Sequence, residues 1–399
     1  MKPVIVLAAH TMGYGIIRSL GHHNIPIISA YYGKEDFGHL SKYINKAVRI
    51  PNPGDNPDDF LNSLIELSKE FGGGLLIPSN DDTLEVVSKN KTLLSEYYTV
   101  ATNDWDITEK VLNKKLTYEI AASLNIDMPK TIFPSSSEEI KIFFTNLNST
   151  VIVKPCVSHT FYNTFSKKFF RFENIKDLNN KIEDLTESNF NVMVQELIKS
   201  KDSDMVMYNA YSINGKPVVE MTAQKMRNGP AVYGNSTVSK SKKIEEIILP
   251  SRKILQHLEF TGYCCIEFRK DLKENKYKFL EINGRYNLSN YLFNGCGINV
   301  PLLEYQYYIL GKEPLNSLNF KEGIYWIDFF RDFSYSIPRV FKREIMFSEL
   351  IKPYFSKHVF AILDFSDLKP FLQRGFKIFK NPSNNLKKSS AYKKKENNF

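Results

Sequence analysis

The chain has 399 residues, of which 42% are hydrophobic, 13% aromatic and 24% charged, so it can bury a sizeable core in about two or three domains. The hydrophobic run at its start is only a few residues long, which is too short for a signal peptide or a membrane span. The four cysteines form no C-x-x-C pair, which argues against a zinc site or a secreted disulfide framework. We therefore expect a globular protein of the reducing cytoplasm, with cysteines that serve packing.

The net charge of +9 lies partly in the segment 381–399, which contains Lys387, Lys388, Lys393, Lys394 and Lys395. One interpretation of this segment is a disordered, solvated terminus. The other is contact with an anionic surface such as a membrane leaflet, which would make the protein peripheral at the inner face of the membrane. A nucleic-acid partner is not expected.

Residues 1–105 alternate strand-like and helix-like segments, the pattern of an open parallel α/β sheet of the Rossmann-like kind. Residues 4–9 and 75–80 predict buried strands, and a helix is predicted to begin at Pro57 with Asn56 as its N-cap. Gly13 and Gly15 follow the first strand, but a dinucleotide fingerprint needs a third glycine where Arg18 stands. We interpret the two glycines as structural.

A helix is predicted from Thr108 to Leu124, and Pro129 then returns the chain to an extended conformation. Residues 150–155 form an apolar strand that ends in Lys154, and a lysine there favours a nearby anion, either a phosphate or an ordinary carboxylate partner. A second apolar strand ends at Gln195 and Glu196.

Antiparallel strands are predicted next, beginning with a hairpin that turns at Asn214 and Gly215. The runs 262–270 and 276–283 flank a charged turn, so they should pair and bring Glu267 beside Glu281, with Asn283 on the same face as Glu281. Clustered oxygen donors without His or Cys favour Mg²⁺ or Mn²⁺. The alternative is that the glutamates pair across the strands with Lys276 or Lys278.

The order of these motifs resembles the ATP-grasp superfamily, and within it the D-aspartate ligase-like carboxylate–amine ligases. The motifs are Lys114 before a helix, Lys154 in VKP, Gln195-Glu196-Leu197, Glu267, and Glu281-x-Asn283-x-Arg285. The resemblance covers residues 1 to about 310. It implies a pre-ATP-grasp domain at 1–105, a lid and first nucleotide-binding subdomain at 106–200, and an α+β metal-binding subdomain at 201–310.

Site roles follow from the resemblance, position by position. It implies that Lys114 and Lys154 hold ATP phosphates and that Glu267, Glu281 and Asn283 hold Mg²⁺. The adenine pocket and the ribose contact would be formed by Gln195, Glu196, Leu197, Ile198 and, for the ribose, Asp204. The resemblance also implies that Arg285 acts at the reacting phosphoryl or carboxylate, with Lys225 and Arg227 near the γ-phosphate or the acid.

The implied function is an ATP- and Mg²⁺-dependent ligase that joins a small-molecule carboxylate to an amine through an acyl phosphate, in cell-envelope or polysaccharide metabolism. The alternative is a catalytically weak ATP-binding scaffold. Two features depart from the family pattern: the loop after Lys154 contains no glycine, and Asn113 stands where an aspartate is common.

Residues 311–380 are rich in aromatic side chains and are interrupted by Pro338, Pro353 and Pro370, so they predict no membrane span. Two interpretations remain for this C-terminal extension. It packs against the preceding domains or covers the substrate, or it docks on a membrane together with the basic segment 381–399.

Overall fold

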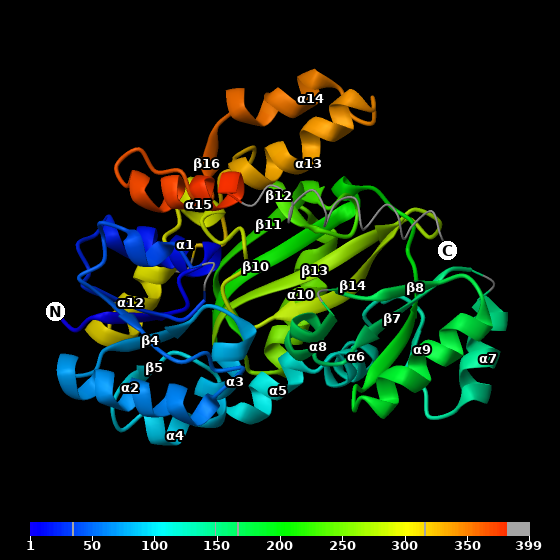
Figure 1. The fold of residues 1–399 in the computed structure, drawn as a ribbon, viewed down its shortest axis with the longest axis horizontal. Helices are drawn as coiled ribbons and strands as arrows, with labels where there is room; N and C mark the ends of the chain where they lie inside the picture. Colours follow the sequence, from blue (N-terminus) through cyan, green and yellow to red (C-terminus); the bar gives the residue numbers. More distant parts are fainter. Residues whose placement is uncertain (34–35, 148, 166, 315–316, 381–399) are drawn as a thin grey trace.

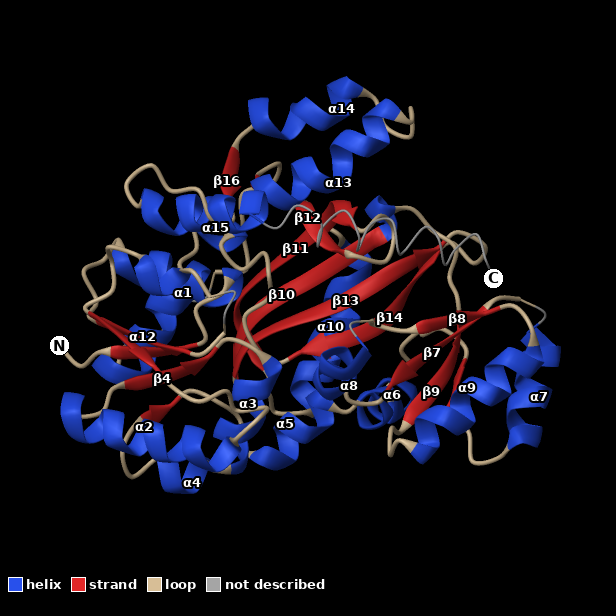
Figure 2. Cartoon of the chain, in the orientation of Figure 1, coloured by secondary structure: helices blue, strands red, loops and turns tan. Residues whose placement is uncertain are grey.

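The computed structural model describes residues 1–33, 36–147, 149–165, 167–314 and 317–380. The predicted basic segment 381–399 lies outside the described residues. Three sheets organise the described chain, one parallel and two mainly antiparallel (Figures 1 and 2). Together they give the α/β and α+β combination that the sequence predicts.

The N-terminal sheet is parallel and has the strand order β3-β2-β1-β4-β5. Its strands are β1 (Val4–Leu7), β2 (Ile27–Tyr31), β3 (Lys46–Arg49), β4 (Leu75–Pro78) and β5 (Thr99–Val100). The accompanying helices are α1 (Thr11–Gly21), α2 (Pro57–Phe71), α3 (Asp81–Lys89) and α4 (Lys91–Leu94). The central strands β1 and β4 are apolar at every position because helices cover both faces of such a sheet.

The paired glycines lie inside helix α1, where they permit close packing. A Cβ atom on Gly13 would stand 2.0 Å from the carbonyl oxygen of Ala8, and one on Gly15 would stand 2.1 Å from Oδ1 of Asn290. Arg18, at the position of the missing third glycine, is buried, and its Nε lies 3.3 Å from the carboxylate of Asp364. The structural interpretation of these glycines therefore agrees with the structure.

The second sheet is antiparallel, with the order β6-β9-β7-β8. Its strands are β6 (Thr131–Ile132), β7 (Val151–Pro155), β8 (Phe170–Phe172) and β9 (Val192–Glu196), and its helices are α7 (Ser137–Leu147), α8 (Ser158–Phe165) and α9 (Ile175–Glu187). The glycine-free loop predicted after Lys154 thus contains a helix.

The helix predicted from Thr108 to Leu124 is two helices, α5 (Trp105–Leu112) and α6 (Lys114–Ser123). Asn113 separates them, and its side chain accepts a hydrogen bond from the N–H of Lys115 at 3.0 Å. An asparagine in this extended conformation caps a new helix, which explains why it can replace an aspartate here.

The third sheet has the strand order β14-β13-β10-β11-β12-β15-β16. Its strands are β10 (Met205–Ile213), β11 (Lys216–Gly229), β12 (Asn235–Ser241), β13 (Gly262–Asp271), β14 (Lys276–Asn283), β15 (Tyr325–Ile327) and β16 (His358–Phe360), with helix α10 (Ile248–His257) packed against β10 and β11. The predicted hairpin turn is confirmed, because Asn214 and Gly215 have positive φ values of 48° and 75°.

The C-terminal extension completes this sheet, since it supplies β15 and β16. The remaining helices are α11 (Leu292–Gly295), α12 (Val300–Leu310), α13 (Phe329–Phe341), α14 (Phe347–Ile351) and α15 (Leu368–Lys380), with short 3-10 turns η1 (Gly38–Leu40), η2 (Asp202–Asp204), η3 (Glu245–Ile247) and η4 (Lys352–Phe355). In the part of the chain that the structure describes, no helix is both long and apolar enough to cross a bilayer.

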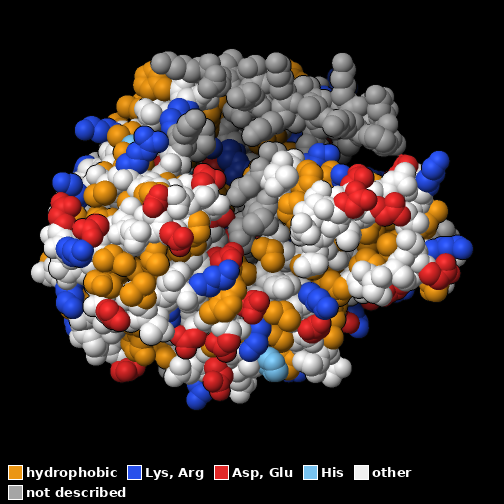
Figure 3. Space-filling model, turned by 60° about the horizontal axis from the view of Figure 1, so that its bottom comes forward, with side chains coloured by type: hydrophobic (Ala, Val, Ile, Leu, Met, Phe, Trp, Pro, Cys, Tyr) orange, Lys and Arg blue, Asp and Glu red, His pale blue; other side chains and the backbone are white. Residues whose placement is uncertain are grey.

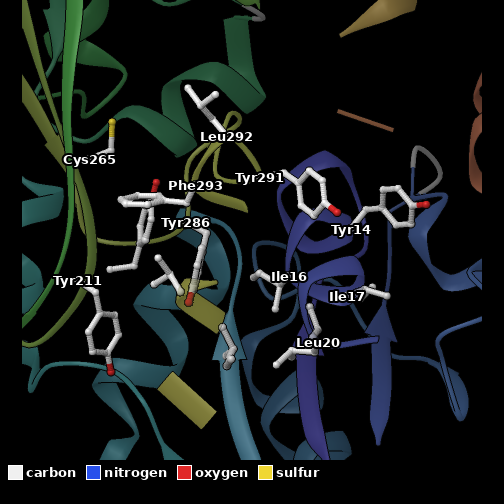
Figure 4. Packing of buried hydrophobic residues seen from close by; sticks show 14 of the residues in the cluster. Tyr14, Ile16, Ile17, Leu20, Tyr211, Cys265, Tyr286, Tyr291, Leu292 and Phe293 are labelled. Atoms are coloured by element: carbon white, nitrogen blue, oxygen red, sulfur yellow. The ribbon is translucent and has the colours of Figure 1, made fainter. Parts of the chain in front are cut away.

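A shared hydrophobic core joins the N-terminal sheet to the third sheet. Tyr14, Ile16 and Leu20 of α1 belong to the same buried cluster as Tyr286 and Phe293, and Figure 4 shows the two groups meeting. This packing holds the carboxyl ends of β1 and β4 toward the third sheet.

Candidate active site

One cavity of about 440 Å³ is lined by side chains of the two antiparallel sheets, of helix α6 and of the residues that follow β4 of the N-terminal sheet. The residues that line it include Asn80, Asp81, Asp82, Lys114, Lys154, Ser158, Tyr162, Lys168, Gln195, Glu196, Leu197, Ile198, Lys225, Tyr233, Glu267, Glu281, Asn283 and Arg285. Most of the site residues expected from the sequence therefore meet at this cavity. Arg227 and Asp204 are not among its lining residues.

The carboxylate cluster forms in the way the strand pattern predicts. Glu267 on β13 stands directly opposite Glu281 on β14, and Asn283 follows two residues later on the same strand. The alternative pairing with Lys276 or Lys278 is wrong: Nζ of Lys276 lies 3.3 Å from Asp127, and the partners of Lys278 are Asp271, Glu196 and Glu274.

Lysines surround the two glutamates. The ammonium of Lys225 on β11 lies 2.7 Å from the Glu267 carboxylate, and that of Lys114 lies 3.9 Å from Glu281. Partial burial would raise the pKa of Glu281, but the charges of the neighbouring lysines, Lys114 foremost, lower it to about 2. Glu281 therefore remains an anion at every physiological pH.

Lys154 is poised to meet an additional anion. Its ammonium donates to Oε1 of Gln195 at 2.9 Å, a neutral acceptor. Burial foremost, together with the positive charge of Lys114, lowers the pKa of Lys154 to about 8 against the opposing effect of Glu281. A polyphosphate at this position would relieve the repulsion among the lysines.

The donor set fits Mg²⁺ or Mn²⁺ rather than zinc. Glu267, Glu281 and Asn283 offer oxygen atoms, and the lining residues include no His or Cys. Within the described ranges no three His, Cys, Asp or Glu side chains form a cluster able to hold a metal by themselves. A magnesium ion held by these residues would take its remaining ligands from phosphate oxygens and water.

A further part of the cavity wall, next to Lys154, is formed by β9 and the residues after it. The Gln195 amide donates to the hydroxyl groups of Tyr118 at 2.7 Å and Thr131 at 2.9 Å, which fixes its orientation. The Glu196 carboxylate accepts from the backbone N–H of Lys130 at 2.9 Å and from Lys278 at 3.1 Å. Leu197 and Ile198 then present apolar surface suited to a planar base.

Asp204 does not reach this cavity. It lies in the turn η2, where its carboxylate accepts a hydrogen bond from the N–H of Lys201 at 2.6 Å. This local cap explains an acidic residue at that position, so the structure gives no support to the expected ribose contact.

Arg285 connects the site to the N-terminal sheet. Its guanidinium makes two hydrogen bonds, of 3.0 and 2.9 Å, to the carboxylate of Asp81 at the start of α3. Asp81, Asp82 and Lys168 line the cavity but were missed as site residues by the sequence interpretation. The position of Asp81 just after β4 was the available signal, because parallel sheets carry their sites at the carboxyl ends of the strands.

The contacts of Arg227 contradict the role expected for it. Arg227 is buried, and its guanidinium donates to both carboxylate oxygens of Asp332 on α13, at 2.8 and 2.6 Å, and to the carbonyl oxygens of Glu349 and Leu350. Side chains two apart normally share a strand face, but the β11 register shifts between Lys225 and Arg227. Lys225 therefore faces Glu267, while Arg227 anchors the C-terminal extension.

Comparison with known proteins gives a relative in sequence and several in structure. No family model matches the chain. D-aspartate ligase from Enterococcus faecium (strain Aus0004) is 26% identical over 324 residues, which cover 74% of each chain.

Solved structures share the fold at low sequence identity. The biotin carboxylase domain of Hydrogenobacter thermophilus 2-oxoglutarate carboxylase, solved with MgADP, has a TM-score of 0.64 at 14% identity and covers 82% of this chain and 73% of its own. L-amino acid ligase from Bacillus licheniformis has a TM-score of 0.58 at 15% identity, covering 77% of this chain and 74% of its own. N5-carboxyaminoimidazole synthetase from Staphylococcus aureus has a TM-score of 0.60 at 14% identity and covers 80% of each chain. The chain is therefore a protein of the ATP-grasp fold, similar to the ligases of that superfamily and to D-aspartate ligase among them.

Proposed function

We propose that the protein is an ADP-forming carboxylate–amine ligase that activates its acid substrate as an acyl phosphate. One observation carries the proposal: four lysines, two glutamates and an asparagine converge on a single cavity from the two antiparallel sheets, from helix α6 and from the segment before β8. The similarity to D-aspartate ligase supports the same reaction class and makes D-aspartate the first acid to test.

The charge of the cavity suits a nucleoside triphosphate. Four ammonium groups, those of Lys114, Lys154, Lys168 and Lys225, surround two carboxylates at this end of the cavity, which leaves an excess of positive charge. We propose that Lys114 and Lys154 contact the phosphates and that the segment Gln195 to Ile198 holds the base. A bound divalent ion on Glu267, Glu281 and Asn283 would neutralise charge as the γ-phosphoryl group is transferred.

The residues supply positioning and electrostatics, and no protein nucleophile is needed. A carboxylate oxygen of the acid attacks the γ-phosphorus of ATP, and ADP leaves. The amine then attacks the acyl carbon, phosphate leaves with its electron pair, and the amine loses a proton. Arg285, held rigidly by Asp81, would stabilise negative charge that develops on the transferring phosphoryl group or on the tetrahedral oxyanion.

The experiment is an assay of ADP release with panels of acids and amines, including both enantiomers of aspartate. The proposal predicts turnover that requires ATP, Mg²⁺, one acid and one amine together. A scaffold would bind ATP and show no turnover that depends on the amine, and that result would refute the proposal. Glu281→Gln serves as the matched inactive control.

A further inference from the structure

Exposed hydrophobic side chains concentrate in the C-terminal extension. Among the described residues, every exposed phenylalanine lies between positions 341 and 376, namely Phe341 at 84%, Phe347 at 63%, Phe355 at 86%, Phe365 at 83% and Phe376 at 64% of full exposure. Single exposed apolar residues need no explanation, but a concentration of large aromatic ones marks an interaction surface.

Helix α15 shows that this exposure has a pattern. Leu368, Leu372 and Phe376 recur every fourth residue, so they share one helix face, and all three are exposed. Phe371 lies beside this row, three residues after Leu368, and its ring stacks on that of Phe330, with 4.6 Å between their centroids. The helix therefore has one apolar stripe, which is covered along the Phe371 edge and exposed along the row Leu368, Leu372 and Phe376.

Helix α14 and its flanking turns form the outermost layer of the extension, at the top of Figure 1. Phe341, Met346, Phe347 and Phe355 all belong to this short region and are at least 63% exposed. We call this region, together with the exposed row Leu368, Leu372 and Phe376 of α15, the apolar edge.

Basic side chains accompany the apolar edge. Lys342, Arg343, Lys352, Lys357 and Lys369 are all exposed. Three nearby carboxylates are buried and paired: Asp332 with Arg227, Asp364 with Arg18, and Asp367 with Ser41. Two are exposed: Glu344, which lies 3.5 Å from Arg339, and Glu349, which accepts from the N–H of Met346, so the exposed basic side chains outnumber the exposed acidic ones. On the face shown in Figure 3, by contrast, acidic and basic side chains are interspersed.

We propose that the apolar edge docks this protein on an anionic lipid surface, with the aromatic side chains inserted at the interface and the lysines against the headgroups. Two weak signals together, apolar insertion and basic charge, are what reversible peripheral binding requires. A second copy of the chain fits this surface less well, because a symmetric contact would place the same cations against each other. The proposal is independent of the ligase activity.

Vesicle co-sedimentation tests the proposal with the full chain. The wild-type protein should bind vesicles of phosphatidylcholine mixed with phosphatidylglycerol, bind pure phosphatidylcholine vesicles at least about tenfold more weakly, and lose binding as salt rises. Phe347→Ser/Phe355→Ser should weaken binding by about tenfold or more. Lys352→Glu/Lys357→Glu should weaken binding only to the anionic vesicles.

Leu249→Ser/Leu272→Ser is the matched control, because these leucines are 62% and 58% exposed on other parts of the surface. This variant should bind vesicles as the wild type does, and all variants should keep the wild-type circular dichroism spectrum. Absence of binding by the wild type, or equal binding by the phenylalanine variant, would overturn the proposal. A stable dimer in light scattering that the phenylalanine variant converts to monomer would overturn it too.

Discussion

Removing the carboxylate of Asp332 should destabilise the protein strongly without touching the cavity. Asp332 has no exposed surface, and besides Arg227 it accepts hydrogen bonds from the hydroxyl groups of Thr237, Ser336 and Tyr354 at 3.0, 3.0 and 2.8 Å. Asp332→Ala leaves the Arg227 guanidinium buried without its counter-charge, and the loss of one partner of a buried pair costs about 3–5 kcal/mol.

The assay is equilibrium urea unfolding, combined with hydrogen exchange over residues 329–341 to locate the loss. Arg227→Met/Asp332→Leu removes both charges and should recover about 2 kcal/mol or more relative to Asp332→Ala. Glu70→Gln is the control, because Glu70 pairs with Lys46 at 3.7 Å on the exposed surface, where such pairs contribute less than about 1 kcal/mol.

The double variant also separates a structural role of Arg227 from an acid-binding one. Since Arg227 faces the extension, Arg227→Met/Asp332→Leu should retain the wild-type KM for the acid. A loss of stability below about 1 kcal/mol in Asp332→Ala would refute the reasoning. A large rise in the KM for the acid in Arg227→Met/Asp332→Leu, with stability unchanged, would refute it too.

Three further predictions concern the cavity. Glu281→Gln should lower kcat by about a hundredfold or more while leaving the fold intact, because the carboxylate that we propose as a metal ligand is lost; wild-type turnover would contradict this. Arg285→Ala should lower kcat more than it raises the KM for ATP, as steady-state kinetics at saturating Mg²⁺ can show; an effect on KM alone would place Arg285 in ground-state binding. Lys154 has a pKa of about 8 in the free protein, and bound phosphate should raise it, so the complex holds more protons near pH 8. ATP binding should therefore take up protons, its affinity should fall as pH rises through about 8, and calorimetry in buffers of different ionisation heat measures the uptake; proton release would contradict the assignment.

Local sequence patterns were sufficient to predict much of the fold. The apolar runs of β1 and β4 predicted a parallel sheet, and the Asn214-Gly215 turn predicted the hairpin, because side-chain periodicity and turn chemistry act over a few residues. The break at Asn113 was missed, since an N-cap within a continuous helical pattern is weak against the surrounding propensity.

The candidate site was likewise predictable from the sequence only in part. The pairing of Glu267 with Glu281 followed from strand length and turn position, so the sequence alone determined the carboxylate cluster. The motif order likewise predicted that Lys114, Lys154 and Arg285 lie together, and all three line the same cavity. Arg227 could not be assigned from sequence, because the register shift after Lys225 is a tertiary feature that turns its side chain away.

Tertiary structure alone decided which distant groups meet. The hydrogen-bonded ion pair of Arg285 and Asp81 joins residues 204 positions apart, and that of Arg227 and Asp332 joins residues 105 positions apart. No periodicity reports such a contact, because it depends on how whole domains pack. The aromatic residues of the extension show the same limit: their composition predicted either packing or docking, and only the folded chain separates partly buried rings such as Phe371 from exposed ones such as Phe376. The sequence determined the chemistry available to this protein, and the packing of its three sheets decided which of those groups share a cavity, because that depends on contacts between segments far apart in the chain.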